Sequence, residues 1–123
     1  MEVKIIEFLN DQYVRVVTKY GELDSRWFGI VPPLGSIKHV ELEIDELFEW
    51  GDNIFLSEEK EFRIESDNII CIIGKLESID DDGYTVIRLG ESIISIIIKG
   101  ISQSIGEYVR LKVTDIELYD VGV

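Results

Sequence analysis

The stretch from Gly74 to Tyr119 most constrains the fold, because short apolar segments alternate there with turns that contain glycine. Asp80-Asp81-Asp82-Gly83 separates two apolar segments, as the turn of a β-hairpin does. Gly90 then leads into Ser92–Lys99, a run whose isoleucines fall on both faces of an extended strand. We expect this strand to be covered on both sides, since an apolar strand left open promotes aggregation. The stretch predicts a β-meander.

The first half of the chain follows a similar plan. Strands are predicted at Val3–Leu9, which is apolar on both faces and so expected to be buried, and at Gln12–Lys19, Leu23–Ile30 and Ile37–Ile44. In Gln12–Lys19, Val14, Val16 and Thr18 share one face; in Ile37–Ile44, Val40, Leu42 and Ile44 do so. Residues 45–50 fit a short strand or one helical turn, and the polar, acidic segment 51–68 fits a hairpin or a partly ordered connector. No long stretch has the apolar period of a helix. We therefore predict an all-β fold of two tandem units packed together, residues 1–50 and 69–123, joined by 51–68.

Similar short motifs recur in the two halves. Tyr20-Gly21-Glu22 corresponds to Leu89-Gly90-Glu91, and Leu34-Gly35 corresponds to Ile105-Gly106. The alternating segment Val40–Ile44 likewise corresponds to Val109–Val113. Each half alone would bury a marginal core, so the repeat predicts that the halves bury a common core, either by packing face to face or by sharing strands.

In the second half, Ile73–Ile79, Tyr84–Gly90, Ile93–Ile98, Ile105-Gly106 and Val109–Leu118 follow one another as strands and loops do in a small β-barrel. This order resembles that of the oligonucleotide/oligosaccharide-binding (OB) barrels and, more loosely, of the small anion-binding barrels of molybdate-handling proteins. The resemblance implies a five-stranded barrel. Because it carries no shared motif, it assigns no ligand residue.

Charge is the strongest signal in the composition. Twelve basic and twenty-five acidic residues give a net charge of −13, and the excess acid is spread along the whole chain. Such a field repels nucleic-acid phosphates and anionic lipid but attracts a basic partner; it also simply favours solubility. No apolar run is long enough for a membrane helix, and a secretory signal is not recognisable. With a single cysteine, a cytoplasmic location is expected.

Familiar catalytic and metal-binding patterns are not recognisable in the sequence. His39, the only histidine, lacks a motif that would pair it with a nucleophile, and Cys71 lies in an apolar strand where thiols are usually inert. Asp80–Asp82 before Gly83 lacks the spacing of a calcium loop and is typical of a turn. We expect neither a cofactor nor a metal.

Glu41, Glu43 and Asp45 share the polar face of one predicted strand. Three interpretations are open: a solvated strand face, a surface that docks a basic partner, or paired carboxylates for acid–base catalysis.

Seven aromatic residues could stack on nucleic-acid bases: Trp27, Phe28, Phe48, Trp50, Tyr84, Tyr108 and Tyr119. The basic residues that would line such a binding groove are scarce, which argues against nucleic-acid binding.

Together these features predict a non-enzymatic binding protein. In general type, although in no motif, the chain resembles the acidic bacterial immunity proteins, which implies an inhibitor that covers a basic toxin or nuclease domain. The predicted contact residues are Glu41, Glu43, Asp45, Glu49 and Trp50. The alternatives are a structural or self-assembling β domain and a weak small-ligand-binding barrel.

Overall fold

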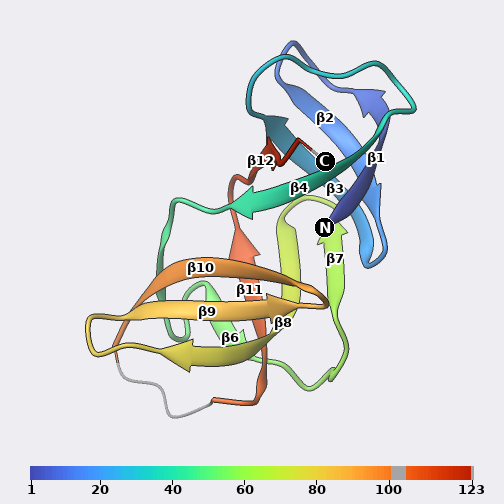
Figure 1. Ribbon diagram of the computed structural model, residues 1–123. Coiled ribbons are helices and arrows are strands. Elements are labelled where there is room, and N and C mark those ends of the chain that lie inside the picture. Colours follow the sequence, from blue (N-terminus) through green and yellow to red (C-terminus); the bar gives the residue numbers. More distant parts are fainter. Residues whose placement is uncertain (101–104, 123) are drawn as a thin grey trace.

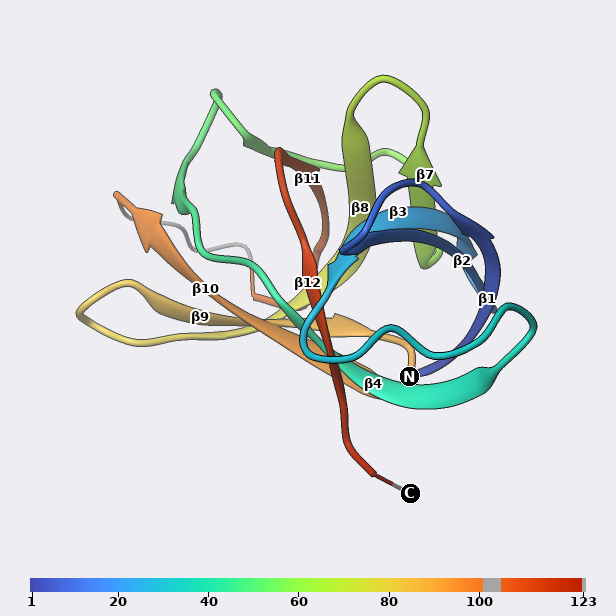
Figure 2. The ribbon, with the colours of Figure 1, turned by 90° about the horizontal axis from the view of Figure 1, so that it is seen from above.

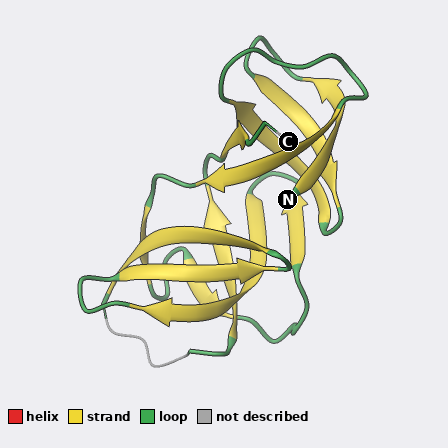
Figure 3. Ribbon diagram, viewed as in Figure 1, coloured by secondary structure: helices red, strands yellow, loops and turns green. Residues whose placement is uncertain are grey.

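The computed structural model describes residues 1–100 and 105–122, and this part of the chain is built of strands without a helix (Figure 3). Twelve strands follow one another in the described residues. Their bounds are β1 Glu2–Phe8, β2 Tyr13–Thr18, β3 Gly21–Trp27, β4 Ile37–Glu43, β5 Leu47–Glu49, β6 Ile54–Leu56, β7 Arg63–Ser66, β8 Ile70–Ile79, β9 Tyr84–Leu89, β10 Ser92–Lys99, β11 Tyr108–Val113 and β12 Glu117–Asp120. The predicted all-β fold of two packed units is confirmed.

The first unit is a closed five-stranded barrel in the order β1–β2–β3–β12–β4. β1, β2 and β3 form an antiparallel meander, and β4 closes the barrel by pairing with β1. Alternate side chains of each strand point inward, so Val14 and Val16 of β2 meet Val40 and Leu42 of β4 in the core. The inward faces predicted for these two strands are confirmed.

The second unit is a bent sheet in the order β5–β10–β9–β8–β11–β6, with β7 paired to β8 beside this path. β8, β9 and β10 repeat the antiparallel meander of the barrel, and β11 pairs with β8 as β4 pairs with β1. Along one side of β8 the partner changes from β7 to β9 around Gly74. A Cβ at Gly74 would lie 2.6 Å from Ile87 Cγ2, so only glycine fits at this bend. The sequence also predicts a bulge at Gly74, because glycine in an apolar strand often marks one. The register shift with β9 instead lies three residues later, between Leu76 and Ser78.

The two units exchange strands. β5 follows β4 along the chain but pairs in parallel with β10 of the second unit. β12 follows β11 along the chain but belongs to the barrel, where it pairs in parallel with β3 and antiparallel with β4. In Figure 1, β12 lies above the second sheet, with the barrel strands. The sequence-based division placed Glu117–Asp120 in the unit 69–123, whereas its hydrogen bonds are with the strands of the first unit. The closed barrel is built from the strands β1 to β4 of the first half together with β12, although the resemblance to OB-type barrels was seen in the second half.

The units also meet along β3 and β7, which lie beside each other in Figure 2. The backbone N–H of Ile64 donates to the carbonyl oxygen of Tyr20 at 3.0 Å. The ring of Phe62 lies between two aromatic neighbours, with its centroid 5.9 Å from that of Tyr20 and 5.6 Å from that of Tyr108. This aromatic contact joins the barrel to the second sheet, because Tyr20 lies in the β2–β3 turn and Tyr108 begins β11.

Other expectations need correction. β1 is not buried on both faces: Val3 and Ile5 point into the barrel, while Glu2 and Lys4 are exposed. For residues 45–50, where a short strand or one helical turn was expected, the strand is the alternative found, as β5. Segment 51–68 supplies β6 and β7, which do not form a hairpin but pair with β11 and β8. The sequence also predicts a loop or a single helical turn at residues 100–106, but residues 101–104 of this segment lie outside the described residues.

None of the described residues belongs to a helix with the length and apolar character needed to span a membrane.

Candidate functional site

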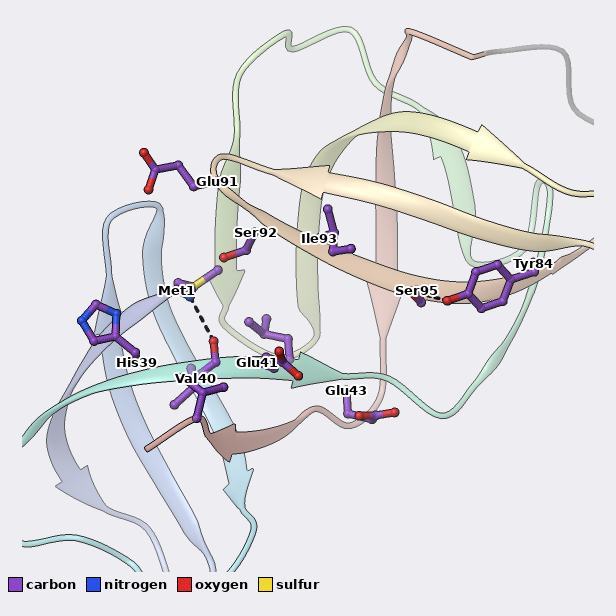
Figure 4. A pocket seen from close by; sticks show the side chains of 12 residues that line it. Met1, His39, Val40, Glu41, Glu43, Tyr84, Glu91, Ser92, Ile93 and Ser95 are labelled. Carbon is purple, nitrogen blue, oxygen red and sulfur yellow. Dashed lines mark hydrogen bonds between the residues drawn. The ribbon is translucent and has the colours of Figure 1, made fainter. Parts of the chain in front are cut away.

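The candidate site is a cleft of about 710 Å³ between the two units (Figure 4). One wall is β4 of the barrel, and the other is the first half of β10 together with the start of β9. Its size is within the usual range of ligand and peptide sites. We call it the interunit cleft; the lining residues used below are His39, Glu41, Glu43, Tyr84, Glu91, Ile93 and Ser95.

The cleft follows from the way the chain leaves the barrel. β4 pairs with β1 and β12, and after residues 44–46 the chain joins β10 as β5. β5 covers only Ile97–Lys99 of β10, so the preceding half of β10 does not have β5 at its side. A wedge therefore opens between β4 and the first half of β10.

Carboxylates dominate the charge of the cleft. Glu41 and Glu43 project from the exposed face of β4, where they alternate with inward-pointing Val40 and Leu42. Glu91, in the β9–β10 turn, adds a third carboxylate on the opposite side (Figure 4). The described residues that line the cleft include no lysine or arginine. The ammonium of Met1 lines the cleft and donates to the Val40 carbonyl oxygen at 3.0 Å, which leaves the carboxylates in excess. The potential around this space is therefore negative, which favours a cationic ligand.

An apolar surface continues from the cleft over three strands. Ile97 of β10 pairs with Leu47 of β5 on one side and with Tyr84 of β9 on the other. Together with Ile93 these side chains form what we call the open face of β10, with exposed fractions of 60% for Leu47, 43% for Tyr84, 51% for Ile93 and 42% for Ile97. The Tyr84 hydroxyl donates to Ser95 Oγ at 2.9 Å and so lies along this face. The expectation that β10 is covered on both sides is wrong, because only Ile94, Ile96 and Ile98 are buried.

A second acidic recess, of about 660 Å³, lies on the other side of the end of β4. Arg26 lies in it and forms ion pairs with Asp115 at 2.5 Å and Glu117 at 3.4 Å. Tyr13 and Asp115 raise the pKa of Arg26 above its usual range. The Glu46 carboxylate accepts hydrogen bonds from the backbone N–H groups of Thr114 and Asp115, at 2.9 and 3.4 Å. Several of the recess's acidic groups are therefore engaged in holding the β11–β12 connection.

The structure separates the predicted contact residues. Glu41 and Glu43 line the interunit cleft, whereas Asp45 lines the second recess, which Glu43 also borders. Glu49 is exposed on β5 opposite Lys99. Trp50 is half-buried against the core, and its indole Nε1 has no hydrogen-bond partner among the described residues. The strip Glu41–Asp45 thus borders two recesses, while Trp50 packs with the second unit.

The other residues considered from the sequence lie apart. His39 lies at the rim of the interunit cleft, with Nε2 3.9 Å from a carboxylate oxygen of Glu2. Cys71 is half-buried, and this burial raises the pKa of its thiol. Asp82 serves the β8–β9 turn by accepting a hydrogen bond from the Tyr84 backbone N–H at 3.2 Å. Within the described part of the chain, histidine, cysteine and acidic side chains form no group of three able to hold a metal ion.

The aromatic residues do not form one stacking surface. Trp27 and Phe48 are fully buried in the core. Phe28 is exposed but stacks on Tyr119, with ring centroids 4.5 Å apart, and Tyr108 belongs to the contact between the units. Of the seven aromatic residues named from the sequence, Tyr84 is the one that lines the interunit cleft.

Sequence reasoning missed the open face of β10 and the role of Glu91. A usable signal was present in the predicted hairpin: once Gly90-Glu91 is placed in the turn, the register sets Tyr84 beside Ile97. The other component, Leu47, could not be placed, because parallel pairing of β5 with β10 joins segments far apart in the chain.

The fold and the cleft define a small all-β protein in which a closed barrel and a bent sheet enclose an acidic, partly apolar cleft. In the comparisons with known proteins, no family model, no curated protein and no solved structure matches the chain.

Proposed function

We propose that the chain is a non-enzymatic binding protein that covers a basic region of another protein. The observation that carries this proposal is the interunit cleft, where three carboxylates border an apolar strand face that is open to solvent. Protein interfaces combine an apolar centre with charged groups around it, and the charges mainly steer association. A net charge of −13 extends this attraction beyond the cleft.

The most specific form of the proposal is an inhibitor of the immunity type, which covers a basic toxin or nuclease domain. In such a complex the carboxylates take the place of nucleic-acid phosphates on the partner's basic surface, and the open face of β10 supplies the apolar contact. Glu41 and Glu43 are the predicted contact residues that fit this arrangement directly, because both line the cleft.

The proposal predicts that a gene beside the one for this chain encodes a basic protein. It is tested by measuring the association rate of that protein with this chain by stopped flow at rising salt. Charge steering predicts an on-rate that falls with salt. The double variant Glu41→Gln/Glu43→Gln should lower the on-rate about 2- to 10-fold at low salt. The control Glu58→Gln/Asp81→Asn removes the same charge from exposed positions outside the cleft and should have a smaller effect. Absence of binding, or equal effects of the two variants, contradicts the proposal.

Self-assembly is the second candidate function, and the open face of β10 is the observation that favours it. Apolar association persists or strengthens as salt screens the repulsion between two strongly acidic copies. Sedimentation at low and high salt separates the two functions: a monomer at both supports the partner-binding function, whereas a dimer that grows with salt supports self-assembly.

A further inference from the structure

We propose that the partner contributes an extended segment that binds in the interunit cleft as an additional strand along β10. This inference rests on the proposed function and specifies the form in which the basic partner is recognised. It depends on backbone groups of β10, which the proposed function alone does not involve.

The first half of β10 is paired on one side. β9 pairs with Ser92–Ile97 of β10 in an antiparallel ladder. On the opposite side β5 begins only at Ile97. In the described part of the chain, no strand pairs with residues 92–96 on that edge, although β4 approaches β10 where the wedge narrows. The wedge that holds the cleft lies at this edge, with β4 as its far wall.

The backbone groups at this edge can be identified. The N–H of Ile98 donates to the carbonyl oxygen of Gly83, just before β9, at 2.9 Å and therefore points toward β9. In an antiparallel ladder successive residues point their N–H and C=O groups alternately toward and away from the partner strand. Ile94 and Ile96 thus face β9 with their backbone groups, whereas Ile93 and Ser95 direct theirs to the open edge. Such an edge is a template for a further strand.

The chemistry of the walls indicates the side chains of this segment. A strand places alternate side chains on its two sides. The open face of β10 begins at Ile93, which lies on the same side of the sheet as Ser95. The carboxylates of Glu41, Glu43 and Glu91 border the interunit cleft next to this face. An extended segment in which apolar residues alternate with lysine or arginine therefore complements both walls, through apolar contact and opposite charge.

The experiment uses the full chain and two synthetic peptides. The first, acetyl-Val-Lys-Val-Lys-Val-Lys-amide, has about the common length of a strand. The second has the same sequence with alternate amides N-methylated, which keeps every charge and side chain but removes strand hydrogen bonds. Titration should give at least about tenfold weaker binding of the methylated peptide. Amide exchange by NMR should show that the unmethylated peptide slows exchange at Ile93 and Ser95 by about tenfold or more, since exchange requires the new bonds to open.

A pair of variants tests the edge from the protein side. Ile93→Pro removes an N–H that the β9 ladder does not use, and proline is tolerated at such an edge position. Ile93→Val keeps the N–H and an apolar β-branched side chain. We expect Ile93→Pro to weaken binding of the unmethylated peptide about tenfold relative to Ile93→Val, with both variants retaining the native NMR pattern. If Ile93→Pro unfolds, the comparison of the two peptides on the unchanged chain still decides.

The possible failures are distinct. Equal binding of the two peptides, with unchanged exchange at Ile93 and Ser95, overturns strand addition but leaves the charge-based function standing. Absence of binding by either peptide overturns both. Protection of Ile93 and Ser95 in the free protein that grows with its concentration would mean that a second copy occupies the edge, and this also overturns the inference.

Discussion

Gly90, in the β9–β10 turn of the second unit, lies against Tyr20, in the β2–β3 turn of the barrel, and its lack of a side chain allows the two turns to approach closely. Its φ is +63°, and a Cβ added there would lie 1.6 Å from the Tyr20 hydroxyl oxygen. We expect Gly90→Ala to lower the free energy of unfolding by about 2–5 kcal/mol, which combines left-handed strain with overpacking. Gly35→Ala is the matched control: its φ is +85° but nothing lies within 4 Å, so only the strain applies and about 1–2 kcal/mol should be lost. Urea unfolding measures both; equal losses would contradict the close contact.

Tyr119 links stability to alkaline pH. The neighbouring Glu117 carboxylate, followed by burial, raises the pKa of Tyr119. The folded state therefore holds the phenol proton more tightly than the unfolded state. The resulting stabilisation is fully present below the unfolded pKa of about 10 and is lost as pH rises through the higher folded pKa. Between about pH 9 and pH 12 the free energy of unfolding of the native protein should therefore fall relative to that of Tyr119→Phe, which has no phenol proton to lose. A difference that stays constant across this range in urea unfolding would count against the shift.

At the scale of elements, residue patterns predicted strands well where apolar and polar residues alternate. Val14 and Val16 in β2, and Val40 and Leu42 in β4, have the predicted inward orientation because one face of each segment is apolar and the other polar. The pattern failed for β10, whose isoleucines on both faces say nothing of which face the rest of the chain covers. It also failed for β6 and β7, whose partners β11 and β8 are set by tertiary pairing and not by neighbouring sequence.

The two faces of β10 should respond differently to the same substitution. Ile96 is 3% exposed, so Ile96→Thr leaves a space and a buried hydroxyl in the core and should cost about 2–4 kcal/mol of unfolding free energy. Ile97→Thr alters the open face and should change stability by no more than about 0.5 kcal/mol. Urea unfolding of the two variants provides the comparison. Similar large losses from both would mean that the outer face is covered in the native protein.

At the scale of the whole molecule, exchange of β5 and β12 couples the two units. The candidate site depends on it, because the wedge between β4 and β10 exists only where the chain crosses from one unit to the other. The sequence could supply Glu41 and Glu43 as a shared polar face, since that relation is local. It could not place them opposite Glu91 and Ile93, because that relation depends on two crossings, after β4 and after β11, that no local pattern encodes.

This coupling predicts that a core substitution in β12 destabilises both units together. Leu118 is fully buried in the barrel, although the segment before β12 belongs to the second unit. Leu118→Ala should cost about 2–5 kcal/mol. Trp27 lies in the barrel and Trp50 adjoins β5 and β6. Trp50→Phe therefore leaves the fluorescence of Trp27 as a reporter of the barrel, and Trp27→Phe leaves that of Trp50 as a reporter of the second unit. In each background, Leu118→Ala should lower the urea midpoint, and the two reporters should keep coincident transitions because the β4–β5 and β11–β12 crossings tie the units into one cooperative structure. If the Trp27 transition moved to lower urea while that of Trp50 stayed in place, the units would unfold independently, and the exchanged strands would join them without making their stabilities interdependent.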